Sequence, residues 1–423
     1  MNHFEYRNGE MFAEQVPLQK IAREVGTPAY VYSLATLKRH FKVFDQAFAR
    51  APHIVCFSVK ANSNLALLRA FAREGSGFDI VSGGELFRAL KVGADPKKIV
   101  FSGVGKKRQE IEYALDAGIL MFNVESEEEL FALNEIAAGA GKKAPISLRI
   151  NPDVDPQTHP YISTGMKKAK FGVDIKKSLD GYKKALALKN VDVVGVDCHI
   201  GSQLTSVTPF VDALAKVREY LDRVLAGEMK KEGAQIRYLD LGGGLGINYH
   251  DETPPLPEEY AAAILRGLEG LDVTLILEPG RVIVGNAGVL LTEVQYVKET
   301  DTKKFVIVDG GMNDLIRPAL YGSYQAIQPV RESQTEKIVA DVVGPICESG
   351  DFFAKDREIA RPRRGDLLAV MSAGAYGFTM ASNYNSHPKP PEVLVDGDKY
   401  YVVRKRESLE DLINGETIPP SLQ

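Results

Sequence analysis

The sequence has few cysteines, and their scarcity excludes the classes of protein that depend on them. Three occur in 423 residues: Cys56, Cys198 and Cys347. They are too few and too widely spaced for a disulfide framework or a paired-cysteine metal site. We therefore expect a protein of a reducing compartment, with Cys198 in the core.

Long apolar runs are also absent. A membrane-spanning helix needs a stretch of about 18 apolar residues, and the nearest candidate, 273–291, is broken by charged residues and a proline. The first fifteen residues contain acids and lack the apolar core of a signal peptide. These features predict a soluble, cytoplasmic protein that does not bind membranes.

No excess of positive charge is present either. The formal net charge is −4, with 26% charged and 44% hydrophobic residues, as in ordinary globular proteins. Such a charge balance gives no reason to expect nucleic acid as a partner. A chain of 423 residues exceeds the usual size of one domain, so two domains, or a large barrel with an appendage, are expected.

What the sequence does contain is a regular alternation of strands and helices. Short apolar, β-branched segments recur at 53–59, 78–82, 98–103, 119–124, 146–151, 193–199, 237–242 and 273–278. Helix-like stretches separate them, and a further amphipathic segment at 34–51 precedes the first. Eight such strands, joined by helical crossovers, predict a parallel (β/α)₈ barrel, the TIM-barrel architecture.

The pattern changes after Pro279 to strands with little helix between them. Asp396-Gly397 and Asn8-Gly9 both lie between strand-like segments and predict two-residue hairpins. We therefore predict a barrel domain at 34–282 and a mainly-β domain, sandwich-like or barrel-like, formed by 1–33 and 283–423.

Unusual residues follow four of the predicted barrel strands. Lys60 follows the first, His199 ends the sixth, the glycines of 242–246 follow the seventh, and Glu278 and Arg281 follow the eighth. The C-terminal ends of the strands form the catalytic face of such barrels. These residues are therefore predicted to meet at one rim.

Each of these features also has an ordinary structural interpretation. Lys60 could attack a carbonyl group as a desolvated amine, or simply reach solvent. The 242–246 segment could bind phosphate through its N–H groups, or form a tight turn. Glu278 could bind a ring nitrogen and Arg281 a carboxylate, or the two could form a salt bridge. His199 could be a hydrogen-bonded core residue; no second ligand lies at metal spacing near it, so no metal is expected.

Taken together, a lysine, a phosphate site, a ring-nitrogen partner and a flat imidazole match the needs of one cofactor, pyridoxal 5'-phosphate. Two alternatives stay open at this point. The protein could be non-catalytic, binding a partner after losing the cofactor, or it could be a phosphate-binding aldolase-type barrel that uses the lysine directly.

The sequence also resembles a known group, the alanine-racemase-fold pyridoxal-phosphate enzymes, and within it the decarboxylases that act on diaminopimelate. The matching segments extend over residues 57 to 385: FSVKAN, FDIVSGGE, KFGV, CHIGSQ, LDLGGGLGI, EPGR, DGGMNDLIRPALYG, GPICESGD and SAGAYGFTMASNYN.

The resemblance implies roles for individual residues. Lys60 would carry the cofactor covalently, His199 would stack on its ring, and Glu278 would pair with its nitrogen. Further contacts to the cofactor are implied for Asp79, Ser202, Gly243, Gly244, Pro279, Gly280, Arg281 and Tyr376. Contacts to the substrate are implied for Arg281, Arg317, Tyr321, Glu348 and Tyr376. Cys347 would be the proton donor, supplied with Glu348 by the second subunit of a head-to-tail homodimer.

The implied reaction is decarboxylation of the small amino acid meso-2,6-diaminopimelate to L-lysine and CO₂, the last step of lysine biosynthesis. Arg317 and Arg281 would suit the distal carboxylate of that substrate, although Arg317 could also be a surface or interface ion pair. The alternative within the same fold is a decarboxylase of D-lysine, D-ornithine or carboxynorspermidine.

Overall fold

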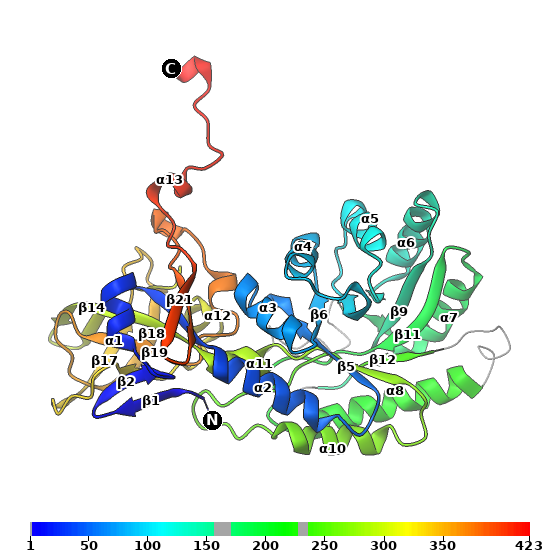
Figure 1. Ribbon diagram of the computed structural model, residues 1–423, viewed down its shortest axis with the longest axis horizontal. Helices are drawn as coiled ribbons and strands as arrows, with labels where there is room; N and C mark the ends of the chain where they lie inside the picture. Colours follow the sequence, from blue (N-terminus) through cyan, green and yellow to red (C-terminus); the bar gives the residue numbers. More distant parts are fainter. Residues whose placement is uncertain (1, 156–170, 227–235) are drawn as a thin grey trace. The chain divides into compact units, whose positions relative to one another are not determined.

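The computed structural model describes residues 2–155, 171–226 and 236–423 (Figure 1). The chain forms two compact units, one of residues 38–283 and one that combines residues 1–37 with 284–423. Lys170 of the KFGV segment lies outside the described residues. Within the described ranges, every helix is too short or too polar to cross a membrane.

The 38–283 unit contains a closed barrel of parallel strands. These are β5 (His53–Ser58), β6 (Gly77–Ile80), β7 (Ile99–Phe101), β8 (Met121–Val124), β9 (Ala144–Asn151), β11 (Val191–Asp197), β12 (Tyr238–Asp240) and β13 (Thr274–Leu277). Neighbours pair in the order β9-β11-β12-β13-β5-β6-β7-β8, and β8 pairs with β9 to close the barrel. A two-residue strand, β10 (Val173–Asp174), adds to β9. The predicted (β/α)₈ barrel is therefore confirmed.

Helices precede, connect and follow the barrel strands. They are α2 (Leu34–Ala47), α3 (Leu65–Arg73), α4 (Gly83–Lys91), α5 (Arg108–Ala117), α6 (Glu127–Gly139), α7 (Ile175–Ala187), α8 (Thr208–Ala226), α10 (Pro257–Gly267) and α11 (Arg281–Val284). Side chains of Asn64, Ser82 and Ser126 accept hydrogen bonds from the first turns of α3, α4 and α6, which explains where these helices begin. The helix expected at 34–51 is α2, which ends at Ala47.

Apolar side chains from several strands pack together in the barrel. Cys56, Val100, Met121, Val194 and Ile276 form one such cluster, each at most 1% exposed. Strands that are buried on both faces need apolar residues at every position, which is why they appear in the sequence as continuous apolar runs. Most of the polar residues that remain lie near the C-terminal ends of the strands, and a few, such as Ser147 in β9, lie within them.

The other unit is mainly β. Its strands are β1 (Phe4–Arg7), β2 (Glu10–Ala13), β3 (Val16–Pro17), β4 (Ala29–Ser33), β14 (Gly288–Glu299), β15 (Lys304–Val308), β16 (Ile327–Pro329), β17 (Lys337–Val343), β18 (Phe352–Ala360), β19 (Leu367–Val370), β20 (Glu392–Asp396) and β21 (Lys399–Arg404). Short helices include α1 (Leu18–Val25), α12 (Arg317–Tyr321) and α13 (Leu409–Leu412). The main sheet has the order β18-β17-β15-β14-β4-β20-β21, so β4 joins the C-terminal strands.

The two predicted hairpins form, with small differences. Asn8 and Gly9 both have positive φ, as a type I′ turn requires, and their hairpin belongs to a separate sheet, β1-β2-β3. The second hairpin pairs Asp396 with Lys399, so its turn is Gly397–Asp398 rather than Asp396-Gly397. Gly397, the first turn residue, has a positive φ of 62° and Asp398 does not, as a type II′ turn requires.

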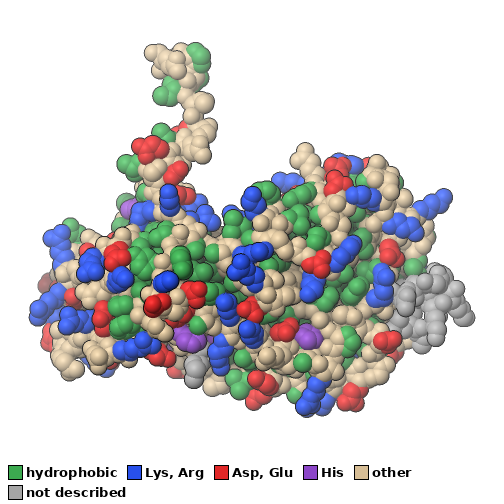
Figure 2. Space-filling model, in the orientation of Figure 1, with side chains coloured by type: hydrophobic (Ala, Val, Ile, Leu, Met, Phe, Trp, Pro, Cys, Tyr) green, Lys and Arg blue, Asp and Glu red, His purple; other side chains and the backbone are tan. Residues whose placement is uncertain are grey.

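Charged side chains of both signs are interspersed over the face shown in Figure 2. This distribution agrees with the small net charge of −4. The polar residues that gather in one place, such as Lys60 and Glu278, lie at the C-terminal ends of the barrel strands.

Candidate active site

Lys60 lies directly after β5, in a 3-10 turn at Val59–Ala61. Its Nζ is 2.7 Å from Oδ2 of Asp79, which is fully buried at the end of β6. The Ser58 hydroxyl donates to the same oxygen at 2.9 Å. The Lys60 side chain remains 36% exposed. Asp79 therefore holds an accessible amine at the mouth of the barrel.

His199 follows β11 and presents an uncharged ring. Burial, helped by the positive charges of Arg149 and Lys60, lowers the pKa of His199 well below its ordinary value of 6.5. The backbone N–H of Gly243 donates to Nδ1 at 3.1 Å. A neutral imidazole whose Nδ1 accepts a hydrogen bond carries its proton on Nε2. His199 is therefore a flat, neutral ring with a fixed tautomer, and such a ring is suited to stacking on another ring.

Three consecutive glycines after β12 leave no room for side chains. A Cβ on Gly242 would lie 2.3 Å from Nδ1 of His199, and one on Gly243 would lie 2.2 Å from the Glu278 carbonyl oxygen. One on Gly244 would lie 2.5 Å from the Gly201 carbonyl oxygen. Gly242 and Gly244 also have positive φ, of 65° and 118°. The segment is thus a sharp turn whose backbone packs directly against neighbouring strand ends.

Glu278 follows β13 and is only 4% exposed. Burial is the main cause that raises the pKa of Glu278 well above 4.5, followed by the negative charges of Asp240, Asp79 and Asp197. Asp240 hydrogen-bonds to Glu278, and burial raises the pKa of Asp240 to about 6. The two carboxyl groups therefore share a proton near neutral pH.

Arg281 begins α11 and is 4% exposed. Its guanidinium donates to the Tyr249 hydroxyl at 2.7 Å and to the Ser202 hydroxyl at 2.9 Å. Pro279 and Gly280, both buried, connect Glu278 to this helix, and the Ser58 N–H donates to the Pro279 carbonyl at 3.1 Å. A buried cation beside neutral hydroxyls is a suitable partner for an anion.

The residues at this rim fit pyridoxal phosphate. Arg281, Ser202 and the glycine backbone offer a cation and donors for a phosphate, and Lys60 offers an amine for the aldehyde. Neighbouring negative charges, that of Asp79 among them, raise the pKa of Asp197, Asp240 and Glu278, so a protonated ring nitrogen would relieve this repulsion. The second oxygen of Asp79, Oδ1, is buried and accepts no hydrogen bond from the described residues.

The remaining predicted site residues lie in the mainly-β unit. Arg317 is 5% exposed at the start of α12, with its guanidinium carbon 5.7 Å from the centre of the Tyr321 ring. Cys347 is exposed, and the Tyr384 hydroxyl donates to Glu348 at 3.3 Å. Tyr376 is partly buried and has a positive φ of 56°.

Three motif segments of that unit are held together by side chains. Asp351 accepts hydrogen bonds from the N–H groups of Met312 and Ile346, each at 2.7 Å. Asn385 accepts one from the Cys347 N–H at 2.7 Å. The DGGMND, GPICESGD and SNYN segments are therefore neighbours, which places Cys347 in a defined loop.

Sequence reasoning missed several polar residues of these clusters. Ser102, Asn123 and Asp240 contact Glu278, and Tyr249 contacts Arg281. Asp240 precedes the glycines within LDLGGGLGI and could have been singled out there. Asn123 lies in an ordinary apolar strand, so nothing in its local sequence indicated a role.

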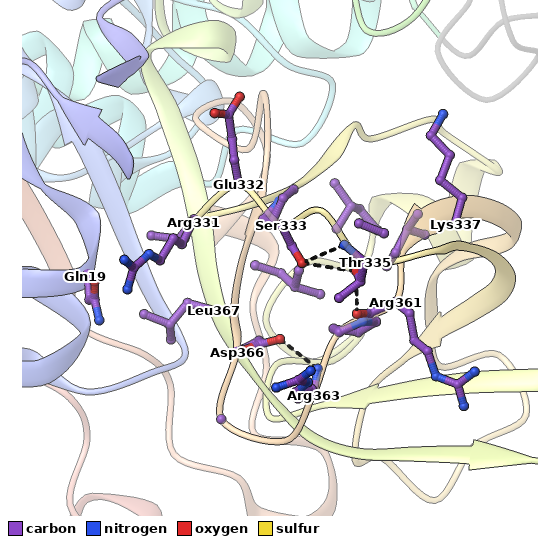
Figure 3. A pocket seen from close by; sticks show the side chains of 18 of the residues that line it. Gln19, Arg331, Glu332, Ser333, Thr335, Lys337, Arg361, Arg363, Asp366 and Leu367 are labelled. Carbon is purple, nitrogen blue, oxygen red and sulfur yellow. Dashed lines mark hydrogen bonds between the residues drawn. The ribbon is translucent and has the colours of Figure 1, made fainter. Parts of the chain in front are cut away.

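A groove of about 560 Å³ in the mainly-β unit is shown in Figure 3. Its wall contains none of the predicted site residues. Arg361, at one side, forms ion pairs with Glu299 and Glu336, and Lys337 pairs with Glu358. Because these charges are already paired with the protein's own acids, we do not regard the groove as the active site.

Comparisons with known proteins agree with the chemistry of the rim. Residues 34–285 match the family model described as "Pyridoxal-dependent decarboxylase, pyridoxal binding domain". A diaminopimelate decarboxylase from Pseudomonas aeruginosa is 56% identical over 420 residues, covering 99% of this chain and 100% of that protein.

Solved structures show the same similarity. The diaminopimelate decarboxylase from Helicobacter pylori, complexed with L-lysine, has a TM-score of 0.90 and 45% identity, covering 94% of this chain and 98% of that one. The enzyme from M. jannaschii, also in complex with L-lysine, has a TM-score of 0.94 and 40% identity, covering 100% of both chains.

Proposed function

This chain belongs to the diaminopimelate decarboxylase family of pyridoxal-dependent decarboxylases, and from this premise we propose that it converts meso-2,6-diaminopimelate to L-lysine and CO₂. The observation that carries the proposal is the pairing of Lys60 with buried Asp79 at the same rim as the Glu278–Asp240 carboxyl pair. Full-length relatives with this name favour diaminopimelate over D-lysine, D-ornithine or carboxynorspermidine.

When bound, pyridoxal phosphate supplies an electron sink for the electron pair left on the α-carbon when CO₂ departs. Lys60 binds the cofactor and is held ready by the Asp79 carboxylate. Glu278 holds a proton at its carboxyl group, where the ring nitrogen can share it. His199 stays neutral and would stack on the ring, and Arg281 and Ser202 would hold the phosphate.

We assign the substrate's distal groups to the mainly-β unit. Arg317 and Tyr321 bind the distal carboxylate, together with Arg281, and Glu348 binds the distal ammonium. Tyr376 contributes to both cofactor and substrate binding. The buried position of Arg317, 5% exposed, supports this assignment, because a guanidinium built to pair with a substrate carboxylate rejects analogues that lack it.

The active form is a homodimer in the cytoplasm, with the partner subunit's Cys347 protonating the α-carbon. Support comes from the family resemblance and from the exposure of Cys347, whose loop is nevertheless held by Asn385.

Product identification tests the proposed reaction. The protein, loaded with pyridoxal phosphate, is incubated separately with meso-diaminopimelate, D-lysine, D-ornithine and carboxynorspermidine, and the products are analysed by chiral chromatography and mass spectrometry. We expect L-lysine from meso-diaminopimelate at a rate far above the others. Preferential turnover of another substrate would replace the proposal with the corresponding decarboxylase.

A further inference from the structure

A buried amide lies among the carboxyl groups beneath the rim. Asn123, in β8, is fully buried. Its Nδ2 is 3.1 Å from Oδ2 of Asp240 and 3.4 Å from Oε1 of Glu278, two residues that are 117 and 155 positions away in the chain. It also donates to the Ser102 hydroxyl at 3.0 Å. One side chain thus joins both members of the carboxyl pair.

The orientation of this amide is fixed from the other side. The Ser147 hydroxyl, in β9, is 2.6 Å from Oδ1 of Asn123. An amide oxygen can only accept, so Ser147 must donate this hydrogen bond. The NH₂ group of Asn123 therefore has to face Asp240, Glu278 and Ser102.

The hydrogen bonds around the pair are unequal. Asp240 accepts from the Gly242 N–H at 2.9 Å through Oδ1 and from Asn123 through Oδ2. Glu278 receives longer contacts, 3.3 Å from the Ser102 hydroxyl and 3.4 Å from Asn123. Because donors to a carboxylate favour its ionised form, Asp240 carries the negative charge and the shared proton is left on Glu278.

We propose that Asn123 is a positioning residue for Glu278: it fixes the carboxyl group and directs the proton of the Asp240–Glu278 pair to Glu278, where the ring nitrogen of pyridoxal phosphate binds. This inference rests on the proposed function, since it assigns to Glu278 the ring-nitrogen contact. If Asn123 only filled the barrel interior, replacing it would change pyridoxal phosphate binding by the same factor whether or not Glu278 was present.

A double-mutant cycle separates these two roles. The dissociation constant of pyridoxal phosphate is measured by absorbance titration of four apoproteins: wild type, Asn123→Leu, Glu278→Gln and the double variant. We expect Asn123→Leu to weaken cofactor binding about tenfold in the wild-type background. In the Glu278→Gln background, which has no proton to direct, the same substitution should change binding by less than about twofold.

Ser147→Ala provides a milder second variant, because it removes only the hydroxyl that orients the amide. It should weaken binding in the same direction as Asn123→Leu, and again only when Glu278 is present. Thermal unfolding of each apoprotein verifies that the variants fold.

Equal losses in the two backgrounds, or no loss in the wild-type background, would overturn the role of Asn123. If the wild-type apoprotein itself bound no pyridoxal phosphate, the proposed function would fail first, and the inference with it.

Discussion

At the end of β12, the Asp240 carboxyl group combines full burial with close acidic neighbours. Burial raises its pKa from 3.8 to about 6, and hydrogen bonds from the Gly242 N–H and from Asn123 limit the rise. The folded protein therefore binds more protons than the unfolded chain between about pH 4 and pH 6. Stability is consequently lost as the pH rises through this range.

Asp240→Asn should reduce this loss, because the amide carries no charge. Its NH₂ group replaces an oxygen that accepts from the Gly242 N–H or from Asn123, and this costs stability by an amount that does not vary with pH. The difference between about 6 and 3.8 corresponds to on the order of 3 kcal/mol once the group is ionised. We expect the stability of the variant apoprotein relative to wild type to rise by about this amount between pH 4 and pH 7–8. Chemical denaturation across this pH range measures the difference, and a difference that is constant with pH would contradict the assignment.

Among the elements, the barrel strands were predicted one by one, whereas several strands of the other unit, β18 among them, were not. Parallel strands covered on both faces consist of apolar residues, so they can be recognised without tertiary information. Strand β18, with the sequence FFAKDREIA, was missed, because it lies at an edge of its sheet and exposes Lys355, Asp356 and Glu358. Its charged residues are typical of an exposed edge strand.

The residues of the candidate site likewise include some that the sequence indicated and one that it did not. Lys60, His199, Glu278 and Arg281 follow strands, and their positions in the sequence already indicated one rim. Asn123 was not predictable, because its contacts to Asp240 and Glu278 arise only when the barrel closes and brings β8, β12 and β13 to a common interior.

The end of helix α6 offers a matched pair of glycines. Gly139 is its last residue, and Gly141 follows with φ of 64°; a Cβ on either would meet nothing within 4 Å. Gly139→Ala should raise the free energy of unfolding by about 0.5–1 kcal/mol, since alanine favours helix. Gly141→Ala should lower it by about 1 kcal/mol, because positive φ strains a residue with a Cβ. Thermal and chemical denaturation of both variants measures the difference, and shifts of the same sign would contradict this account of the helix end.

For the whole molecule, the proposed dimer combines Lys60 of one subunit with the partner subunit's Cys347. Lys60→Ala and Cys347→Ala proteins, each inactive, are unfolded together and refolded as an equal mixture. About half of the dimers are then mixed, and each mixed dimer contains one intact site. The mixture should recover roughly a quarter of wild-type activity.

Refolded wild-type protein serves as the control for this experiment. If it regains activity while the mixture stays inactive, Lys60 and Cys347 do not combine across subunits, and the site belongs to a single chain.

The most direct test of the central claim is the location of the cofactor. The protein is loaded with pyridoxal phosphate, reduced with borohydride, digested and mapped by mass spectrometry, with Lys60→Ala as the control. Our account predicts one stable adduct, on Lys60, that is absent from the variant. An adduct on a different lysine, or none in the wild-type protein, would contradict the assignment of the barrel rim as the active site.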